Sequence, residues 1–245
     1  MAVRLIGKTS GIDDTEYANR SIDEIIAGIA RISSSRMVNE LFDSPEKLLR
    51  HCILNGHWSI FTMANLTFEI TTSRAIGREL LRHWSIKPQE FSQRYSKVAQ
   101  MEKIELREQS KNNRQSSVNI IEDKYLNWKA EQHLEASQQL YNELIANDVS
   151  RESARFLLPE ATTTRLIMNG GIREWVTTLN QRLHKSAQKE CRLIAEEIRD
   201  LFMRECPIIS NALFNFEYSY EIHILDRLVL EKYGIFQEVV KSKGL

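Results

Sequence analysis

Loop-forming residues are scarce in this chain, and their scarcity favours helices. Of 245 residues, 9 are Gly and 4 are Pro, so few positions interrupt a regular backbone. Apolar residues recur at helical spacing over 22–29 and again over 126–144. No internal repeat and no Gly- or Pro-rich linker divides the sequence. The length allows one large domain or two small ones, and the missing linker leads us to predict a single domain over 1–245.

Capping residues mark the starts of the expected helices. Ser21 and Glu24 fit a capping box. Ser44-Pro45 fits an N-cap followed by a first-turn proline, and that helix should end near 55–56. Ser73 is the expected N-cap of a helix that runs to about residue 84. Further helices are predicted over 122–146, from Ser150 to just before Pro159, and from Gly170-Gly171 with interruptions to Cys206.

The strand signals are fewer. Leu66, Phe68 and Ile70 alternate with polar residues, which is the period of a half-buried strand. Residues 3–6 are a second candidate, and 100–120 is polar enough to predict a loop. The tail over 214–240 is compatible with a strand and with a final helix. The sum predicts an α+β fold, a small, mostly antiparallel sheet with many packed helices.

The charge balance and the cysteines exclude several classes of protein. The 33 basic and 33 acidic residues give no net charge, so no overall field attracts nucleic acid. The three cysteines, Cys52, Cys191 and Cys206, contain no C-x-x-C pair, which disfavours a disulfide framework or a metal site and favours the cytoplasm. The first residues turn polar too early for a signal peptide. No apolar run approaches the about 20 residues that cross a membrane.

A row of arginines precedes a proline-broken loop. Arg74, Arg78 and Arg82 follow each other at intervals of four, which puts them on one helical face. One interpretation is a solvated face with Glu69 and Glu79 as partners. The other is an anion site.

The next residues favour the anion site. Pro88 cannot sit inside a helix, so the chain should leave the helix after Trp84 and form a loop. That loop carries Glu90, Ser92 and Arg94. Arginine and serine donate to phosphate, whereas a carboxylate accepts from a ribose hydroxyl or a base N–H. Donors and an acceptor together indicate a nucleotide ligand.

The same stretch carries a family resemblance. RHWSIKPQEFS (82–92) resembles the R-H-R-x7-S signature of flavin-dependent thymidylate synthases, with Trp84 in place of the second arginine. Five other segments resemble the family in the same order: ARISSS (30–35), NGHWSIF (55–61), RESARFLLP (151–159), GGIREWVTTLNQR (170–182) and SAQKE (186–190). The resemblance covers about residues 25–210.

The resemblance implies an activity and a set of ligands. Members of this family methylate dUMP to dTMP, take the one-carbon unit from methylenetetrahydrofolate, and use NADPH to reduce a tightly bound FAD. They are homotetramers that hold FAD and dUMP where subunits meet, and they use no cysteine nucleophile. By resemblance we expect a cytoplasmic homotetramer with no metal, no nucleic acid and no membrane partner.

The resemblance also assigns roles to individual residues. Arg182 is the expected catalytic residue, because it would lie against the uracil and favour ionisation at N3. The expected dUMP-binding residues are Glu79, Arg82, Glu90, Phe91, Ser92, Gln93, Arg94, Arg155 and Arg182. The expected residues at FAD and folate are His57, Ser59, Arg82, His83, Trp84, Glu90, Gly171, Ile172, Arg173 and Thr177. Glu79 replaces the family's usual glutamine, and Gly171 and Thr177 each replace an asparagine.

Without the resemblance, several of these residues have ordinary explanations. Arg182 would be an exposed helix charge, His57 a histidine at a helix end, and each cysteine a small buried hydrophobe. Three alternative functions also stay open. They are a nucleotide- or flavin-binding relative without turnover, the same chemistry on another pyrimidine nucleotide such as dCMP, and a nucleic-acid module built on the arginine row.

Overall fold

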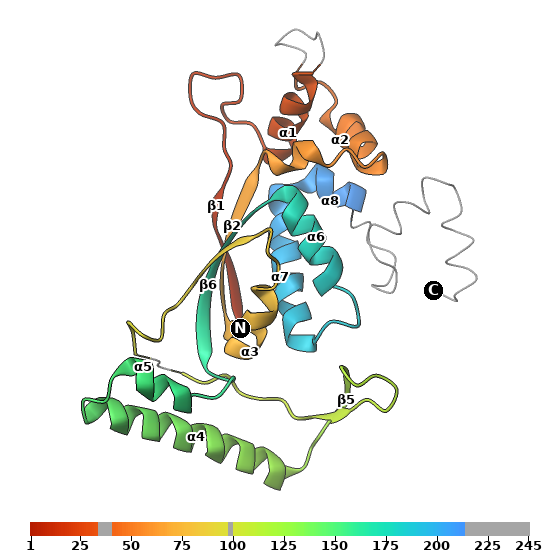
Figure 1. Ribbon diagram of the computed structural model, residues 1–245. Helices are drawn as coiled ribbons and strands as arrows, with labels where there is room; N and C mark the ends of the chain where they lie inside the picture. Colours follow the sequence, from red (N-terminus) through yellow and green to blue (C-terminus); the bar gives the residue numbers. More distant parts are fainter. Residues whose placement is uncertain (34–40, 98–99, 214–245) are drawn as a thin grey trace. The chain divides into compact units, whose positions relative to one another are not determined.

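The computed structural model describes residues 1–33, 41–97 and 100–213 (Figure 1). The described residues divide into two compact units, and the strands of one sheet run through both. The first unit contains Met1–Ala2, Ile70–His83 and the described part of Pro88–Ile167. The second contains Trp84–Lys87 and the described parts of Val3–Glu69 and Met168–Leu245.

Helices dominate the second unit. They are α1 (Ile22–Arg31), α2 (Pro45–Leu54), the 3-10 helix η2 (Ser59–Thr62), α6 (Ile172–Arg182), α7 (Lys189–Glu205) and α8 (Pro207–Leu213). α2 packs on α1 and α8, and α6 packs on η2 and α7 (Figure 1). The largest core side chain is Trp175, which is fully buried and meets Phe68 edge to face at 4.8 Å between ring centroids. Its Nε1 donates to the backbone oxygen of Leu66 at 3.0 Å, so the indole is both packed and satisfied.

The first unit is built around one long helix. Its elements are α3 (Arg74–Leu80), β4 (Arg107–Gln109), β5 (Ser117–Ile120), α4 (Lys124–Ala146), α5 (Arg151–Ala154) and the 3-10 helix η3 (Arg155–Leu157). α4 packs on α5 and η3. The centre of that contact is Tyr141 and Ala154, with Phe91, Leu144 and Leu158 among the side chains around them. Asp123 caps α4 by accepting from two backbone N–H groups.

The main sheet has four strands in the order β1-β2-β6-β3, which are β1 (Ala2–Lys8), β2 (Asn65–Ser73), β6 (Thr163–Gly171) and β3 (Lys87–Glu90). Three hydrogen bonds fix the directions. They join the end of β1 to the start of β2, the residue before β2 to the end of β6, and the end of β3 to the start of β6. Each neighbouring pair is therefore antiparallel. The α+β prediction with a small antiparallel sheet is confirmed.

Most predicted helix starts are confirmed, although their capping differs. The capping box of Ser21 and Glu24 is present in both directions. Ser44 and Ser73 are N-caps, but neither side chain caps its helix, and Ser44 has a positive φ of 44°. α3 ends at Leu80, four residues before the predicted end at Trp84. β3 then begins at Lys87, where a loop was expected.

One further prediction needs correction, and one strand was not foreseen. The stretch 100–120, predicted as a loop, contains β4 and β5, which pair as an antiparallel hairpin. β6 was not predicted, although its buried residues Thr164, Leu166 and Met168 alternate with more exposed neighbours. The expected strand or helix over 214–240 lies outside the described residues. Within 1–33, 41–97 and 100–213, no helix combines the length and apolarity of a membrane span.

Candidate functional site

A basic pocket lies in the first unit. It has a volume of about 340 Å³, and its wall is formed by α3, the loop after β3 and the segment that leads from α5 into β6. Its lining residues are Arg74, Arg78, Gln93, Arg155, Phe156, Leu158, Pro159 and Glu160. Two of the predicted dUMP-binding residues, Gln93 and Arg155, are therefore brought together by segments 62 positions apart.

Backbone hydrogen bonds hold two walls of this pocket together. The N–H of Arg74 donates to the oxygen of Thr162 at 2.9 Å, and the N–H of Ala75 donates to the oxygen of Glu160 at 3.1 Å. These bonds use N–H groups at the start of α3 that have no partner within the helix. The first turn of α3 is thereby fixed against the segment before β6, so the arginines on it have a defined position.

The charges in the pocket are only partly paired. Arg78 forms an ion pair with Glu160 at 2.8 Å, and Arg74 lies 3.4 Å from Glu90. The half-buried Arg155 forms no ion pair with any described residue. The Nε2 of Gln93 is buried and has no hydrogen-bond partner in the described chain. A buried donor without a partner is costly, and an anion would satisfy both this amide and the Arg155 guanidinium.

The other residues of the loop after β3 are held by contacts with residues that do not line the pocket. Ser92 Oγ accepts from the N–H of Arg94 at 3.3 Å, and Arg94 reaches Glu152 on α5 at 3.4 Å. Phe91 packs against the cluster around Tyr141. Phe91 thus anchors the loop through its side chain, and of the residues that follow it Gln93 is buried and Arg94 is exposed.

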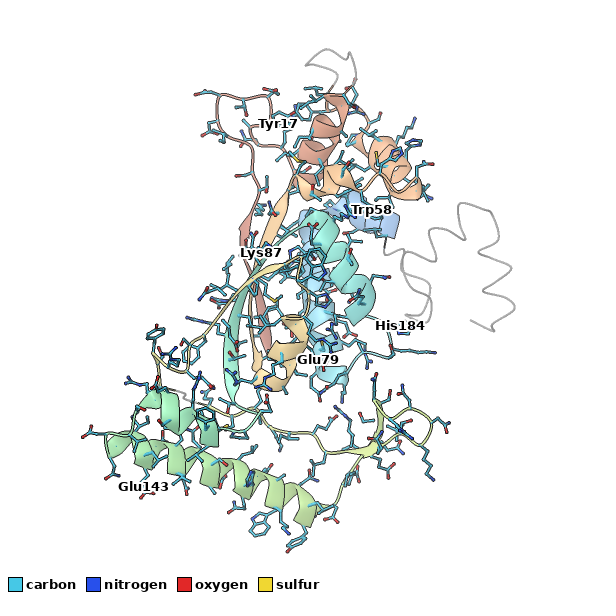
Figure 2. All side chains as sticks on the ribbon, in the orientation of Figure 1. Tyr17, Trp58, Glu79, Lys87, Glu143 and His184 are labelled. Carbon is cyan, nitrogen blue, oxygen red and sulfur yellow. The ribbon has the colours of Figure 1, made fainter. Side chains whose placement is uncertain are left out.

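The other predicted residues of the R-H-W segment differ in accessibility. Glu79 lies on α3 and is half-buried (Figure 2). Arg82 is exposed and His83 is buried, and both follow the end of α3. Trp84 belongs to the second unit, where its side chain is 88% exposed. An indole this exposed contributes little to the core and is available to a ligand or a partner.

A second group of predicted residues lies on η2, just before η2 and on α6. The two elements pack together in the second unit. His57, Ser59, Arg173 and Thr177 are exposed there. Thr177 Oγ1 donates to the oxygen of Arg173 at 3.1 Å, so the hydroxyl keeps its acceptor capacity for another group. This surface offers a guanidinium, two hydroxyls and an imidazole.

The start and end of α6 carry the remaining candidates. Gly171 is the N-cap, and a Cβ there would lie 2.2 Å from Glu174 Oε2 and 3.3 Å from Thr62 Cα. A larger side chain at 171 would therefore require Glu174 to move. Ile172 is fully buried, and its N–H donates to the oxygen of Ala64 at 3.0 Å. Arg182 is the last residue of α6 and is half-buried.

The cysteines do not form an activated nucleophile. Cys52, Cys191 and Cys206 are all buried. Burial raises the pKa of the Cys52 thiol. The pKa of Cys206 is raised well above its usual value by burial and then by the negative charges of Asp23 and Glu205. A protonated, buried thiol is a poor nucleophile. Among the residues that the structure describes, no group of three or more His, Cys, Asp or Glu side chains is arranged to hold a metal ion.

Arg74 and Arg78 line the pocket, although the family motif assigns them no ligand. Their i, i+4 spacing could have identified them as pocket residues, because it puts both side chains on one face of α3. Sequence reasoning could not tell that face from a solvated one, because the opposing wall comes from 155–160, far along the chain.

Comparison with known proteins gives the family. The family model for the thymidylate synthase complementing protein (Thy1) matches residues 16–208. A flavin-dependent thymidylate synthase of Synechocystis sp. is 40% identical over 216 residues, which are 87% of this chain and 99% of that protein. A probable flavin-dependent thymidylate synthase of Paramecium bursaria Chlorella virus 1 is 36% identical over 218 residues, with 87% and 99% covered.

A solved structure shares the fold. The UMP/dUMP methylase PolB of Streptomyces cacaoi, solved with 5-Br dUMP, superposes with a TM-score of 0.71 at 22% identity, over 88% of this chain and 95% of that one. The sequence relatives are similar over nearly their whole length, and the family model spans most of the described residues. The chain belongs to the Thy1 family, and it is an enzyme of that family.

Proposed function

We propose that this protein converts dUMP to dTMP. Methylenetetrahydrofolate is the one-carbon donor, and NADPH is the reductant for a bound FAD. The observation that carries the proposal is the basic pocket. Among the described residues the buried Gln93 amide has no hydrogen-bond partner, and Arg155, whose guanidinium lies over the Phe156 ring, forms no ion pair. A nucleotide phosphate supplies the acceptors that both lack. The curated names of the relatives and the dUMP analogue bound to PolB agree with this ligand.

The first unit would hold the nucleotide. Arg155 and Gln93 bind the phosphate, and Arg74 and Arg78 add positive charge at the same wall. Ser92 and Arg94 follow β3 on either side of the pocket residue Gln93 and would extend the set of donors. Glu90 accepts from the sugar or the base, since a carboxylate would repel the phosphate. Glu79 and Arg82 complete the set on and after α3.

The exposed residues of η2 and α6 fit a flavin cofactor. Gly171 at the N-cap of α6 has no side chain that accepts from the first turn, and Arg173 is exposed one residue inside the helix. An exposed guanidinium suits a pyrophosphate. Ser59 on η2, Thr177 on α6 and His57 just before η2 offer further polar contacts. When bound, FAD supplies the hydride chemistry of the reaction.

Arg182 is the residue we assign to catalysis. Negative charge develops on the pyrimidine as its C5 becomes nucleophilic. A fixed guanidinium against the ring stabilises that charge in a site from which water is excluded. Arg182 is suited to this role because it ends a helix whose other face is buried through Trp175 and Leu179.

The active assembly is proposed to be a homotetramer. Three aromatic side chains, Trp84, Tyr95 and Phe156, are 88%, 80% and 83% exposed in the single chain. Trp84 is itself a predicted FAD residue, and the other two each follow a predicted dUMP residue. Large exposed aromatics close together in sequence with ligand residues are typical of surfaces that a partner covers. A second copy of the chain is the proposed partner. The cytoplasm is the proposed compartment, because three buried thiols are best kept in a reducing environment.

The cofactor part of the proposal is tested by visible absorption. The purified protein is mixed with FAD and freed of unbound cofactor. A retained flavin spectrum supports the site despite Trp84 and Gly171. A colourless protein, with or without dUMP, would favour a relative that does not turn over.

The substrate part is tested with the flavin-loaded protein and a panel of dUMP, UMP and dCMP. We expect methylation of dUMP to exceed that of the other two. Preference for dCMP would move the function to another pyrimidine nucleotide, with Glu79 the first residue to examine.

A further inference from the structure

Glu90 is held by two side chains to which the family motif assigns no role. Thr164 Oγ1 donates to Glu90 Oε1 at 2.9 Å, and Arg74 Nη1 lies 3.4 Å from the same oxygen. The three residues come from β6, β3 and the first turn of α3. Both contacts are made to Oε1, and no described residue donates to Oε2. One carboxylate oxygen is therefore fixed by the protein, and the other is available to a ligand.

The fold leaves Thr164 little freedom. Its side chain is 2% exposed, and its methyl group faces Gly77 on α3, where a Cβ would lie 3.1 Å from it. A glycine at 77 thus allows the threonine and the helix to approach closely. β-branching restricts χ1 of Thr164 further. The hydroxyl is directed at Glu90 by packing and not by the hydrogen bond alone.

The backbone around Glu90 is hydrogen-bonded to β6, the strand that carries Thr164. The N–H of Phe91 donates to the oxygen of Arg165 at 2.8 Å, which sets Glu90 beside Thr164 in the sheet. Arg74 is fixed in turn by its own N–H bond to Thr162 at 2.9 Å. All three side chains therefore belong to rigid elements, which is the arrangement that holds a functional group in one orientation.

We propose that Thr164 and Arg74 are positioning residues for the Glu90 carboxylate. They hold Oε1 so that Oε2 accepts a hydrogen bond from the sugar hydroxyl or the base N–H of the nucleotide. This inference rests on the proposed function, because it takes Glu90 as a nucleotide ligand. Thr164 acts only through Glu90, so its loss should matter only while the carboxylate is present.

A double-mutant cycle tests this directly. Thr164→Val, Glu90→Gln and the double variant are prepared as full chains with FAD. Affinity for dUMP is measured by calorimetry, and KM and kcat are measured separately. Thr164→Ser keeps the hydroxyl and serves as the rescue variant. Thr163→Val removes the neighbouring hydroxyl, whose residue is half-exposed on the same strand, and serves as the matched control.

The positioning role predicts a definite pattern. Thr164→Val and Glu90→Gln each weaken dUMP binding by about tenfold, the size of one hydrogen bond to a charged group. The double variant is no weaker than Glu90→Gln alone. Thr164→Ser and Thr163→Val bind dUMP as the wild type does, and both retain flavin.

Three results would overturn the inference. They are a Thr164→Val protein that binds dUMP normally, a Glu90→Gln protein that does so, and effects that multiply in the double variant. A wild type that binds dUMP but forms no dTMP would refute the proposed function alone, because the double-mutant cycle is measured through dUMP affinity and needs no turnover. A wild type that binds no dUMP would refute both.

Discussion

The Asp23 carboxylate accepts a hydrogen bond from the backbone N–H of Ile208 at 2.8 Å, although the two residues are 185 positions apart. Asp23 also accepts from the N–H of Ile209 at 3.3 Å. A carboxylate from the first turn of α1 thereby caps the start of α8. Asp23 is fully buried, and Ile208 and Ile209 are the groups that compensate it.

The first prediction concerns the pH dependence of stability. Burial raises the pKa of Asp23 from 3.8 to about 6, while the two N–H bonds lower it and the charge of Glu24 raises it slightly. Because the folded pKa lies above the unfolded one, the folded chain binds more protons between these values. The free energy of unfolding should therefore fall, by about 3 kcal/mol, as pH rises from about 4 to about 7.

Urea unfolding of the wild type and of Asp23→Asn across this range measures the effect. The difference between the two curves isolates Asp23 from other titrating groups, and it should change with pH. Asp13→Asn, which alters an exposed carboxylate after β1, should run parallel to the wild type. A parallel curve for Asp23→Asn would contradict the assignment.

The second prediction concerns the basic pocket. Arg155→Ala should weaken dUMP binding by about 10- to 100-fold, which corresponds to the loss of a charge-assisted hydrogen bond of about 1.5–3 kcal/mol. Deoxyuridine lacks the phosphate, so its affinity should not change. Calorimetry with both ligands makes the comparison.

Arg151→Ala is the matched control for this measurement. Arg151 starts the short helix just before Arg155, is exposed, and does not line the pocket. It should bind dUMP as the wild type does. Equal losses of dUMP and deoxyuridine affinity in Arg155→Ala would mean that Arg155 supports the fold of the pocket and not the phosphate.

The third prediction concerns catalysis. Arg182→Ala should retain flavin and lose most turnover, by about 100-fold or more, because a fixed charge at a developing anion contributes about 2.7–4 kcal/mol. Flavin absorbance and the rate of dTMP formation measure the two properties separately. Arg204→Ala, at an exposed position in the last turn of α7, controls for the loss of a helical arginine. Unchanged turnover in Arg182→Ala would remove Arg182 from the mechanism.

The fourth prediction concerns assembly. Light scattering should give four times the 28.6 kDa mass of the chain. Phe156→Ser should shift the protein to smaller species, because an exposed aromatic of this kind is typical of the centre of an interface. Ile12→Ser changes another exposed apolar residue, 75% exposed in the loop after β1, and should leave the mass unchanged. A monomeric wild type would overturn the tetramer.

The elements that local signals determine could be predicted from the sequence. The capping box at Ser21 and the alternation through Phe68 each identified an element correctly. β6 was missed because its alternation is carried partly by threonines, whose burial depends on the neighbouring strands. The β4–β5 hairpin was missed because its residues are polar and largely exposed.

Motifs pointed to two residues of the basic pocket but not to the pocket's geometry. Gln93 and Arg155 were identified by resemblance, and the structure brings both into one pocket. The hydrogen bond of Thr164 to Glu90 spans 74 positions, and no spacing rule reaches that far. The pairing of Arg78 with Glu160 is of the same kind. Contacts between residues so far apart in the sequence depend on the fold and can be recognised only in the structure.

The most direct test of the central claim uses dUMP labelled with tritium at C5. Attachment of a methyl group at C5 must release that hydrogen, so tritium release and dTMP formation should rise together. The account predicts that both occur at equal rates and only when the protein, FAD, NADPH and methylenetetrahydrofolate are all present. No tritium release and no dTMP from a flavin-loaded protein that binds dUMP would contradict it, and would leave a nucleotide-binding relative without turnover.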